Sequence, residues 1–267
     1  MSCWRLLSRE IADSFTYTSD HSLIEKAGYG CVRRLSFPSQ SVMSKTIQLT
    51  ADDGHTFSAY ESGAEGNSVA GLIILQEIFG VNHHIRSVAD TYADEGFYTL
   101  APALFDRAEP GVELDYSPAS IQAARGFLSQ IEEGAMLKDI KASIDHARRH
   151  VASRKVGVVG YCMGGSYAWL SATRLKPDAA VGYYGSKVLE CIGETPVCPV
   201  MLHFGSQDQH IPVSDVEKIR EARPGLPVFL YDAGHGFNCD ERGSYSEAAA
   251  SLAFSRSLIF LKETLHV

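Results

Sequence analysis

The sequence predicts an α/β fold in which a doubly wound, mainly parallel sheet is flanked by helices. Apolar runs of strand length alternate with segments of helical periodicity over most of the chain. One such run, Val156–Gly160, leads into the sequence Y-C-M-G-G at Tyr161–Gly165, which is typical of a strand that turns sharply into a helix. With 267 residues, 45% of them hydrophobic, the chain can bury one large core.

The first part of the chain differs from the rest. Residues 1–42 lack the alternation of strands and helices, and we expect them to form a poorly packed N-terminal extension. They have no continuous apolar segment and they carry acidic residues, which disfavours a secretory or mitochondrial leader. A mis-called upstream start codon is a second explanation for them. Patterned strands begin after Met43, so residues 43–267 are predicted to form one domain.

The elements of this domain are predicted in chain order. Thr46–Thr50 and His55–Glu61 alternate apolar and polar residues on either side of an Asp-Asp-Gly turn, which indicates a hairpin. The continuous apolar run Gly71–Gln76 is typical of a strand buried on both faces of a parallel sheet. A helix with one apolar face is expected over His83–Glu95, with Asn82 as its N-cap.

The alternation continues to the C-terminus. A strand is expected at Phe97–Ala101, and a loop rich in proline, glycine and charge follows over Asp106–Ser117. Later strands are predicted at Ala179–Tyr183, Val200–Phe204 and Val228–Tyr231, and helices at Ser120–Ile131, Met136–Ala152, Met163–Arg174, Val213–Glu221 and Tyr245–Glu263. Ligands of such sheets bind at the carboxyl ends of the strands, so we expect the functional residues there.

Composition excludes several classes of function. The formal net charge of −8 disfavours a nucleic-acid-binding surface. No apolar run approaches the roughly 20 residues that span a membrane. The 6 cysteines are scattered, without a C-x-x-C pair, so we expect a reduced cytoplasmic protein without disulfides, metal or cofactor. We further expect a monomer.

Cys162 is the candidate nucleophile. The glycines around it permit a sharp turn at the end of a strand, which exposes the thiol. The N-terminus of the helix that starts at Met163 favours its thiolate form. A tight turn around a buried thiol is the alternative interpretation.

A cysteine nucleophile needs a base, and the candidate is His235, in a loop after the last predicted strand. Asp208 also follows a strand and is expected to orient the histidine. The chain order nucleophile, acid, histidine is that of α/β-hydrolases, which makes the predicted fold an α/β-hydrolase fold. A surface loop position is the alternative for Asp208 and for His235. His203 and His210 are rival bases, but His203 is expected in the core and His210 is too close to Asp208 in sequence to be held by it.

Two backbone N–H groups are expected to stabilise an oxyanion. One belongs to Met163, after the nucleophile, and the other is assigned to Ile78, after the first buried strand. Glu77, directly before Ile78, is a carboxylate at the end of a buried strand, a costly position without a partner. We interpret Glu77 as a group that lies against Cys162 and controls its protonation. An exposed loop residue or a helix cap is the alternative.

Taken together, these residues resemble the dienelactone hydrolase family, and the resemblance runs from Met43 to the C-terminus. Its most specific pieces are Q-E-I-F-G-V-N from Gln76, G-Y-C-M-G-G from Gly160, A-V-G-Y-Y-G from Ala180 and G-H-G-F from Gly234. The resemblance implies a Cys162–His235–Asp208 triad, with Glu77 holding the resting thiol. It also implies hydrolysis of a small lactone or ester through a thioester, such as the opening of a dienelactone to maleylacetate, without cofactor or metal.

Substrate-binding residues are implied in the same way. Arg107 matches a family arginine that binds the substrate carboxylate, with a solvated loop charge as the alternative. Tyr183 and Tyr184 match a tyrosine pair near the pocket, and Tyr184 is our candidate. A second family arginine lies four residues after the catalytic histidine, where this chain has Cys239; Arg242 is the residue that could take its place. A general carboxylesterase without dienelactone preference, and a catalytically silent binding module, therefore remain as alternatives.

Overall fold

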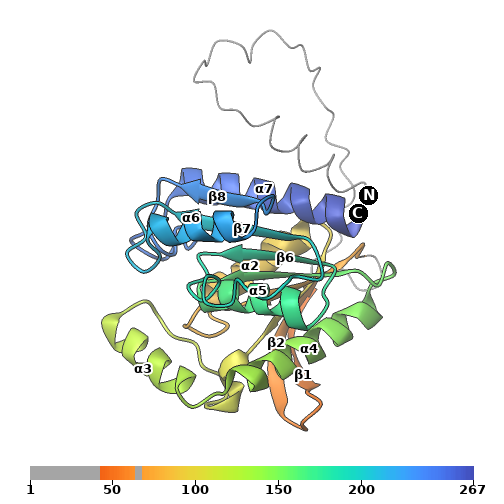
Figure 1. Cartoon of the computed structure of the whole chain (residues 1–267). Helices are drawn as coiled ribbons and strands as arrows, with labels where there is room; N and C mark the ends of the chain where they lie inside the picture. The colour runs from red at the N-terminus through yellow and green to blue at the C-terminus, as the bar shows by residue number, and fades with distance from the viewer. Residues whose placement is uncertain (1–42, 64–67) are drawn as a thin grey trace. The chain divides into compact units, whose positions relative to one another are not determined.

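A computed structural model gives the structure of the protein and describes residues 43–63 and 68–267. These residues belong to one compact unit, Ser41–Val267, while the expected extension over residues 1–42 lies outside the described residues. The unit contains an 8-stranded sheet in the order β1-β2-β4-β3-β5-β6-β7-β8 (Figure 1). The predicted α/β fold with a mainly parallel sheet is therefore confirmed.

The strands at the β1 edge of the sheet are antiparallel and all the others are parallel. β1 (Met43–Thr50) and β2 (Thr56–Gly63) form the predicted hairpin, and β2 pairs antiparallel with β4 (Tyr98–Pro102). All later pairs are parallel, so the carboxyl ends of these strands share one edge of the sheet. The parallel strands are β3 (Gly71–Leu75), β4, β5 (Val156–Tyr161), β6 (Ala179–Tyr183), β7 (Val200–Gly205) and β8 (Val228–Tyr231).

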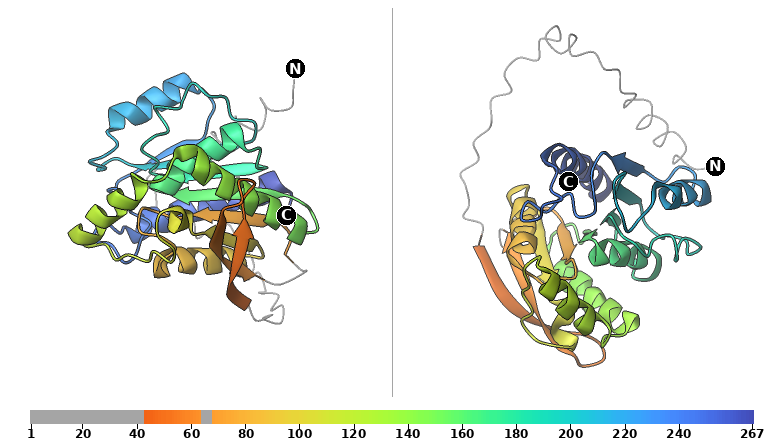
Figure 2. Two further views of the ribbon diagram at one scale, coloured as in Figure 1. Left: turned by 90° about the horizontal axis from the view of Figure 1, so that it is seen from below. Right: turned by 90° about the vertical axis from the view of Figure 1, so that its left-hand side faces the viewer.

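Helices cover both faces of the sheet (Figures 1 and 2). On one face, α2 (His83–Asp94) packs against α7 (Glu247–Leu265), with ring centroids of Tyr92 and Phe254 5.1 Å apart. On the other face, α4 (Glu133–His150) contacts α5 (Met163–Arg174). The remaining helices are the 3-10 turn η1 (Leu104–Arg107), α3 (Pro118–Leu128) and α6 (Val213–Ala222).

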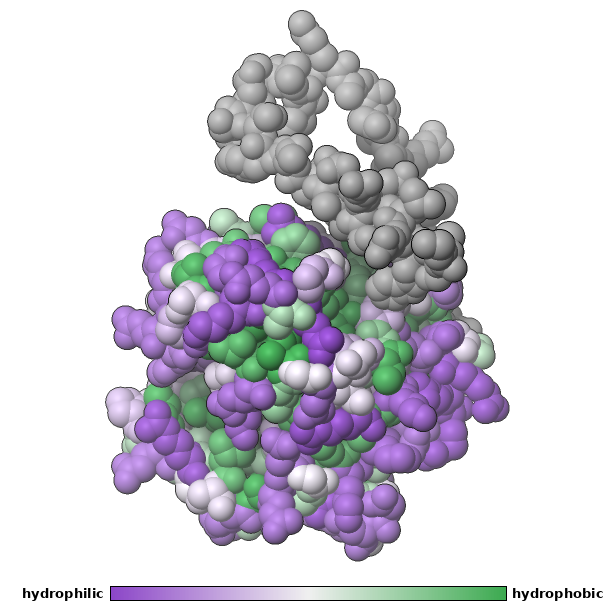
Figure 3. All heavy atoms as spheres, in the orientation of Figure 1, coloured by the Kyte–Doolittle hydropathy of each residue, from purple (hydrophilic) through white to green (hydrophobic). Residues whose placement is uncertain are grey.

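The central strands are buried along their whole length. Each residue of β3, β4, β5, β6 and β7 is buried, as expected when helices cover both faces of a parallel sheet. On the face of the molecule in Figure 3, hydrophilic residues surround smaller hydrophobic areas. None of the helices in the described part of the chain is long and apolar enough to span a membrane.

The predicted bounds of the helices needed small corrections, and helix caps explain them. Asn82 caps α2 as predicted, because its Oδ1 accepts the N–H of Ile85. The last helix begins at Glu247 rather than Tyr245, since Ser246 is the N-cap. Similarly, Ser117 caps α3, which therefore begins two residues before the predicted start. The expected loop after β4 begins with the η1 turn, which the pattern did not reveal.

Candidate active site

Cys162 lies on a strained turn between β5 and α5. Its backbone has φ 54° and ψ −114°, a conformation that costs a non-glycine residue about 1–3 kcal/mol. The chain passes so close to itself here that a Cβ on Gly160 would lie 1.9 Å from the Gly164 carbonyl oxygen. A Cβ on Gly164 would lie 2.3 Å from the Leu75 oxygen. The two glycines therefore permit the turn that presents the Cys162 side chain at the sheet edge.

Cys162, His235 and Asp208 form a hydrogen-bonded chain across this edge. The Nε2 atom of His235 lies 3.2 Å from Cys162 Sγ, and its Nδ1 atom lies 2.7 Å from Asp208 Oδ2. The three residues follow β5, β8 and β7, whose parallel alignment brings their carboxyl ends together. The structure thus gathers residues that are 73 and 27 positions apart in sequence.

His235 and Asp208 stabilise each other's charged forms. Burial by itself would lower the pKa of His235, but hydrogen bonds to Asp208 and Cys162 raise it to about 10. Burial by itself would raise the pKa of Asp208, but His235 lowers it below its ordinary value, with help from the backbone N–H groups of His210 and Ile211. An ionised acid beside a basic imidazole is the arrangement that lets a histidine accept a thiol proton.

The rival histidines have other roles. His203 is fully buried, with its two ring nitrogens 2.8 Å from Tyr231 Oη and 3.0 Å from Ser257 Oγ. Burial lowers the pKa of His203 to about 3. The expectation of a satisfied core histidine is confirmed. His210 contacts Asp208 through its backbone N–H, at 2.7 Å, rather than through its ring.

Glu77 is buried near the Cys162–His235–Asp208 group and pairs with Arg242. Only 1% of Glu77 is exposed, so the alternative of an exposed loop residue is wrong. Its Oε1 atom lies 3.0 Å from Arg242 Nη1, while Oε2 has no hydrogen-bond partner among the described residues. The guanidinium of Arg242 lies 5.7 Å from the ring centroid of Phe79 and 5.6 Å from that of Tyr116. The structure therefore brings Arg242 to the site that Glu77 occupies.

Ile78 and Met163 belong to two segments that are tied together. The N–H of Gly164 donates to the carbonyl of Gln76 at 3.0 Å, which fixes the loop after β3 against the turn after β5. The described residues offer no hydrogen-bond acceptor to the N–H of Ile78 or of Met163. Both N–H groups are therefore without an acceptor within the described structure.

The two tyrosines differ in the direction of their side chains. Tyr183 Oη lies 2.7 Å from Ser257 Oγ, in the core. Tyr184 has φ 38°, and its ring centroid lies 5.0 Å from that of His235. Tyr184 Oη is buried without a hydrogen-bond partner in the described structure, and this burial, reinforced by the charge of Glu77, raises the pKa of Tyr184 well above its ordinary value. Tyr184 is therefore the tyrosine that lies against the site.

Arg107 lies in a separate ion-pair cluster. Its Nε and Nη2 atoms donate to the two oxygens of Asp139 at 2.8 and 2.7 Å, and its Nη1 lies 3.0 Å from Asp53. The Asp139 side chain is fully buried and the Arg107 side chain is 13% exposed, so the alternative of a solvated loop charge is also wrong. The structure does not bring Arg107 to Cys162, and its contact with a substrate carboxylate stays a prediction that this placement does not support.

Sequence reasoning missed two residues near Glu77, His84 and Tyr116, and it noted Cys239 only as the residue at the position of a family arginine. His84 is 3% exposed and Cys239 is fully buried. Burial raises the pKa of the Cys239 thiol to about 11. No local pattern signals this grouping, because Glu77, His84 and Cys239 meet only in the tertiary structure.

Comparisons with known proteins identify the family of the chain. A model of the dienelactone hydrolase family matches residues 57–265. A carboxymethylenebutenolidase of Pseudomonas putida is 35% identical over 228 residues, covering 82% of this chain and 97% of that protein. A carboxymethylenebutenolidase of Cupriavidus pinatubonensis is 30% identical, with 82% and 97% covered. The crystal structure of a "Putative Dienelactone Hydrolase" from Klebsiella pneumoniae has a TM-score of 0.74 at 27% identity and covers 84% of this chain and 99% of that chain.

The family match spans most of the chain. The two carboxymethylenebutenolidases are aligned with this chain over nearly their full length. The protein is a hydrolase that acts on esters, with the α/β-hydrolase fold, and its chain belongs to the dienelactone hydrolase family.

Proposed function

We propose that the protein hydrolyses a small lactone or ester through a thioester on Cys162. The observation that carries this proposal is the hydrogen-bonded chain Cys162–His235–Asp208, with 3.2 and 2.7 Å between the paired atoms, on a strained turn. The relatives named carboxymethylenebutenolidase support a lactone as the substrate.

The reaction has two halves. His235 holds the proton of the Cys162 thiol as an imidazolium, and the thiolate beside it attacks the carbonyl carbon, so that a C–S bond forms and the carbonyl oxygen becomes an oxyanion. The free N–H groups of Ile78 and Met163 stabilise this oxyanion. The ester C–O bond then breaks, and the leaving oxygen takes the proton from His235.

Water completes the cycle. It attacks the thioester carbon and gives a proton to His235, and the second tetrahedral intermediate releases Cys162 as a thiolate beside the protonated His235, which restores the starting state. Asp208 holds the imidazole in position and stabilises its charged form during both halves. This route needs neither a metal nor a cofactor.

Glu77 and Arg242 act as a gate for an anionic substrate. In the resting protein their ion pair has a distance of 3.0 Å and is mostly buried. A substrate carboxylate would compete with Glu77 for Arg242, and the displaced Glu77 would then be free to act on the Cys162 thiol. Tyr184, whose Oη has no partner within the described structure, would donate a hydrogen bond to the bound substrate.

A general carboxylesterase is the second candidate, and one observation favours it. Arg107 is engaged by Asp139 and Asp53, which leaves Arg242 as the cation beside Glu77. A site with one arginine binds a substrate carboxylate less tightly than a site with two. Neutral aryl esters would then be hydrolysed about as well as anionic lactones.

The test combines a nucleophile variant with a panel of substrates. We expect Cys162→Ala to lower kcat for p-nitrophenyl acetate by at least about 10³-fold, because the covalent step is lost. Cys198→Ser, a thiol change away from this chain of residues, serves as the matched control and should leave kcat unchanged. Iodoacetamide should inactivate the control by alkylating Cys162, the thiol that the Ala variant lacks.

Full activity in Cys162→Ala would refute the proposed nucleophile. The substrate is decided by comparing cis- and trans-dienelactone with neutral aryl esters. A higher kcat/KM for a dienelactone supports the lactonase, whereas equal values support the general carboxylesterase.

A further inference from the structure

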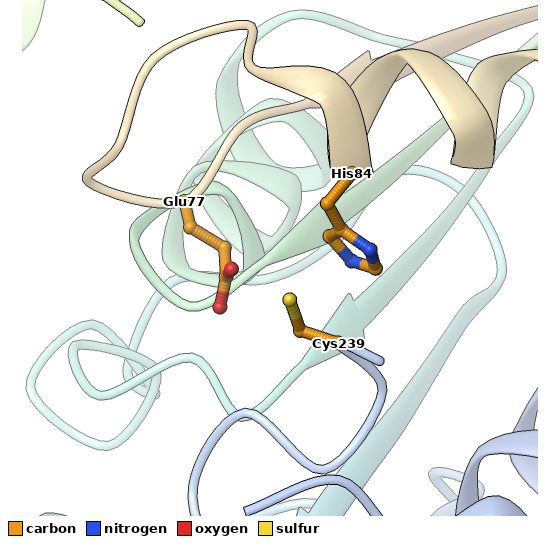
Figure 4. A group of neighbouring side chains, drawn as sticks. All are labelled: Glu77, His84 and Cys239. Carbon is orange, nitrogen blue, oxygen red and sulfur yellow. The ribbon is translucent and has the colours of Figure 1, made fainter. Parts of the chain in front are cut away.

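Three side chains that can bind a metal ion lie close together, and one of them is Glu77 of the proposed gate. Glu77, His84 and Cys239 each place a ligand atom within 4.8 Å of those of the other two (Figure 4). They come from the loop after β3, the first turn of α2 and the loop before α7. All three side chains are buried, with exposed fractions of 1%, 3% and 0%. The grouping is therefore part of the interior and not a chance cluster of surface charges.

Two of the ligand groups have atoms without a partner. Glu77 Oε2 and His84 Nε2 are buried and have no hydrogen-bond partner among the described residues. Leaving buried polar atoms unpaired costs free energy, so such atoms in a native structure call for a ligand. Glu77 keeps Oε2 available even in the resting state, because its contact with Arg242 uses Oε1.

The groups next to these ligands suit a bound cation. His84 Nδ1 lies 3.3 Å from Asp240 Oδ1, which leaves the other ring nitrogen for a metal, as in carboxylate–histidine–metal arrangements. Tyr116, which lies near this group, accepts a hydrogen bond from Asn82 Nδ2 at 3.0 Å. The contact with Asp240 orients the imidazole of His84.

We propose that Glu77, His84 and Cys239 form a zinc site, with a fourth position open to water. One sulfur, one nitrogen and one carboxylate oxygen are ligands that Zn²⁺ accepts in tetrahedral geometry. Bond lengths of about 2.0–2.3 Å place tetrahedral ligands about 3.5 Å apart, so the three side chains need to converge by about 1 Å. On binding, the Cys239 S–H bond breaks, the sulfur bonds to Zn²⁺ and the proton goes to solvent. The carboxylate and the thiolate then neutralise the charge of the ion.

Zinc at this position would inhibit hydrolysis. Glu77 would be fixed by the metal and could no longer move toward the Cys162 thiol when substrate binds. This consequence rests on the proposed function, whereas the binding of zinc does not.

Binding is tested on the full-length protein, purified without metal, by titration with Co²⁺ as a spectroscopic probe and by competition with Zn²⁺. We expect one Co²⁺ per chain, with d–d bands of a tetrahedral site and a thiolate-to-cobalt charge-transfer band. Cys239→Ser should abolish the charge-transfer band, and His84→Asn should weaken Zn²⁺ binding by more than about 100-fold, since outer partners alone contribute 10–100-fold.

Two control variants identify the sulfur. Cys162→Ala should retain the charge-transfer band, because Cys162 is not a ligand, and Cys198→Ser should retain it as the matched thiol control. The proposal is overturned if the metal-free protein binds no cobalt or zinc at micromolar concentrations. It is also overturned if the band persists in Cys239→Ser and disappears in Cys162→Ala.

The consequence for activity is measured separately. Micromolar Zn²⁺ should inhibit ester hydrolysis by the unaltered protein, while His84→Asn and Cys239→Ser should resist inhibition at the same concentration. Inhibition that is equal in all variants would place the inhibitory ion elsewhere. If the protein binds zinc as expected but hydrolyses no ester, the proposed function fails and the metal site stands.

Discussion

At the residue scale, His235 joins the thiol of Cys162 to the carboxylate of Asp208. These two neighbours raise the pKa of His235 to about 10. Burial acts against them, because the His235 side chain is only 12% exposed and a buried imidazole is harder to charge. A protonated imidazole is thus stabilised in the native protein more than in the unfolded chain. The same contacts that prepare the histidine for proton transfer therefore also link stability to pH.

This linkage gives a first prediction. Between the ordinary pKa of 6.5 and about 10, the native protein holds a proton on His235 that the unfolded chain has lost. The free energy of unfolding should therefore fall as pH rises through this range, with the contribution of His235 complete below pH 6.5. The thermal unfolding midpoint, measured at several pH values across this range, should fall in the same way.

His235→Gln is the control for this measurement. This variant lacks the imidazole that titrates. Its thermal unfolding midpoint should therefore fall less between pH 6.5 and 9 than that of the unaltered protein. Burial also raises the pKa of the Cys198 and Cys239 thiols, and these affect stability only above their ordinary value of 9. Equal slopes for the two proteins below pH 9 would contradict the prediction.

At the element scale, the site depends on the turn between β5 and α5. Gly160 and Gly164 let this turn approach the loop after β3, so that Gly164 N–H reaches the Gln76 carbonyl at 3.0 Å. The strain at Cys162 is held by this packing and not by the local sequence. The glycines were recognisable in the sequence, but the atoms that exclude a side chain belong to residues distant along the chain, such as Leu75.

Gly160→Ala tests this dependence. Its Cβ would lie 1.9 Å from the Gly164 carbonyl oxygen, which is backbone and cannot rotate away. We expect the free energy of unfolding to fall by at least about 3 kcal/mol, since overpacking of this kind forces the backbone to shift. Urea denaturation followed by circular dichroism measures the change.

Gly126→Ala is the matched control, because Gly126 lies in α3 and a Cβ there would meet nothing within 4 Å. It should raise the free energy of unfolding by about 0.5–1 kcal/mol, the usual difference between alanine and glycine inside a helix. Similar effects for the two substitutions would mean that close approach at Gly160 does not limit the turn.

At the scale of the whole molecule, charge and strand order act over longer distances. The formal net charge of −8 repels anionic substrates, while Arg242 supplies a partly buried cation at the site. The parallel sheet collects the loops after β3, β5, β6, β7 and β8 at one edge, where all the residues of the proposed mechanism lie. The expected monomeric state and cytoplasmic location stay predictions.

The net charge leads to a prediction about salt. Raising ionic strength from about 0.01 to about 0.15 M shortens the screening length from about 30 to about 8 Å, which removes most of the long-range repulsion. We therefore expect kcat/KM for mono-p-nitrophenyl succinate to rise several-fold, because burial protects Arg242 from screening. For neutral p-nitrophenyl acetate, kcat/KM should stay constant and serves as the control. A decrease for the anionic ester would show that attraction by local cations outweighs the net charge.

The sequence by itself determined the order of the elements, the turn at Cys162 and the three residues Cys162, Asp208 and His235, because hydrophobic periodicity, glycine and strand ends are local signals. Helix bounds shifted by a few residues where a serine cap decided them. Only the tertiary structure separated Arg242, which reaches Glu77, from Arg107, which a buried aspartate engages. The sequence does not show which carboxylate a long arginine side chain contacts. That contact depends on which carboxylate the fold buries next to it. The grouping of Glu77, His84 and Cys239 was invisible for the same reason, since their segments meet only when β3, α2 and the loop before α7 pack together.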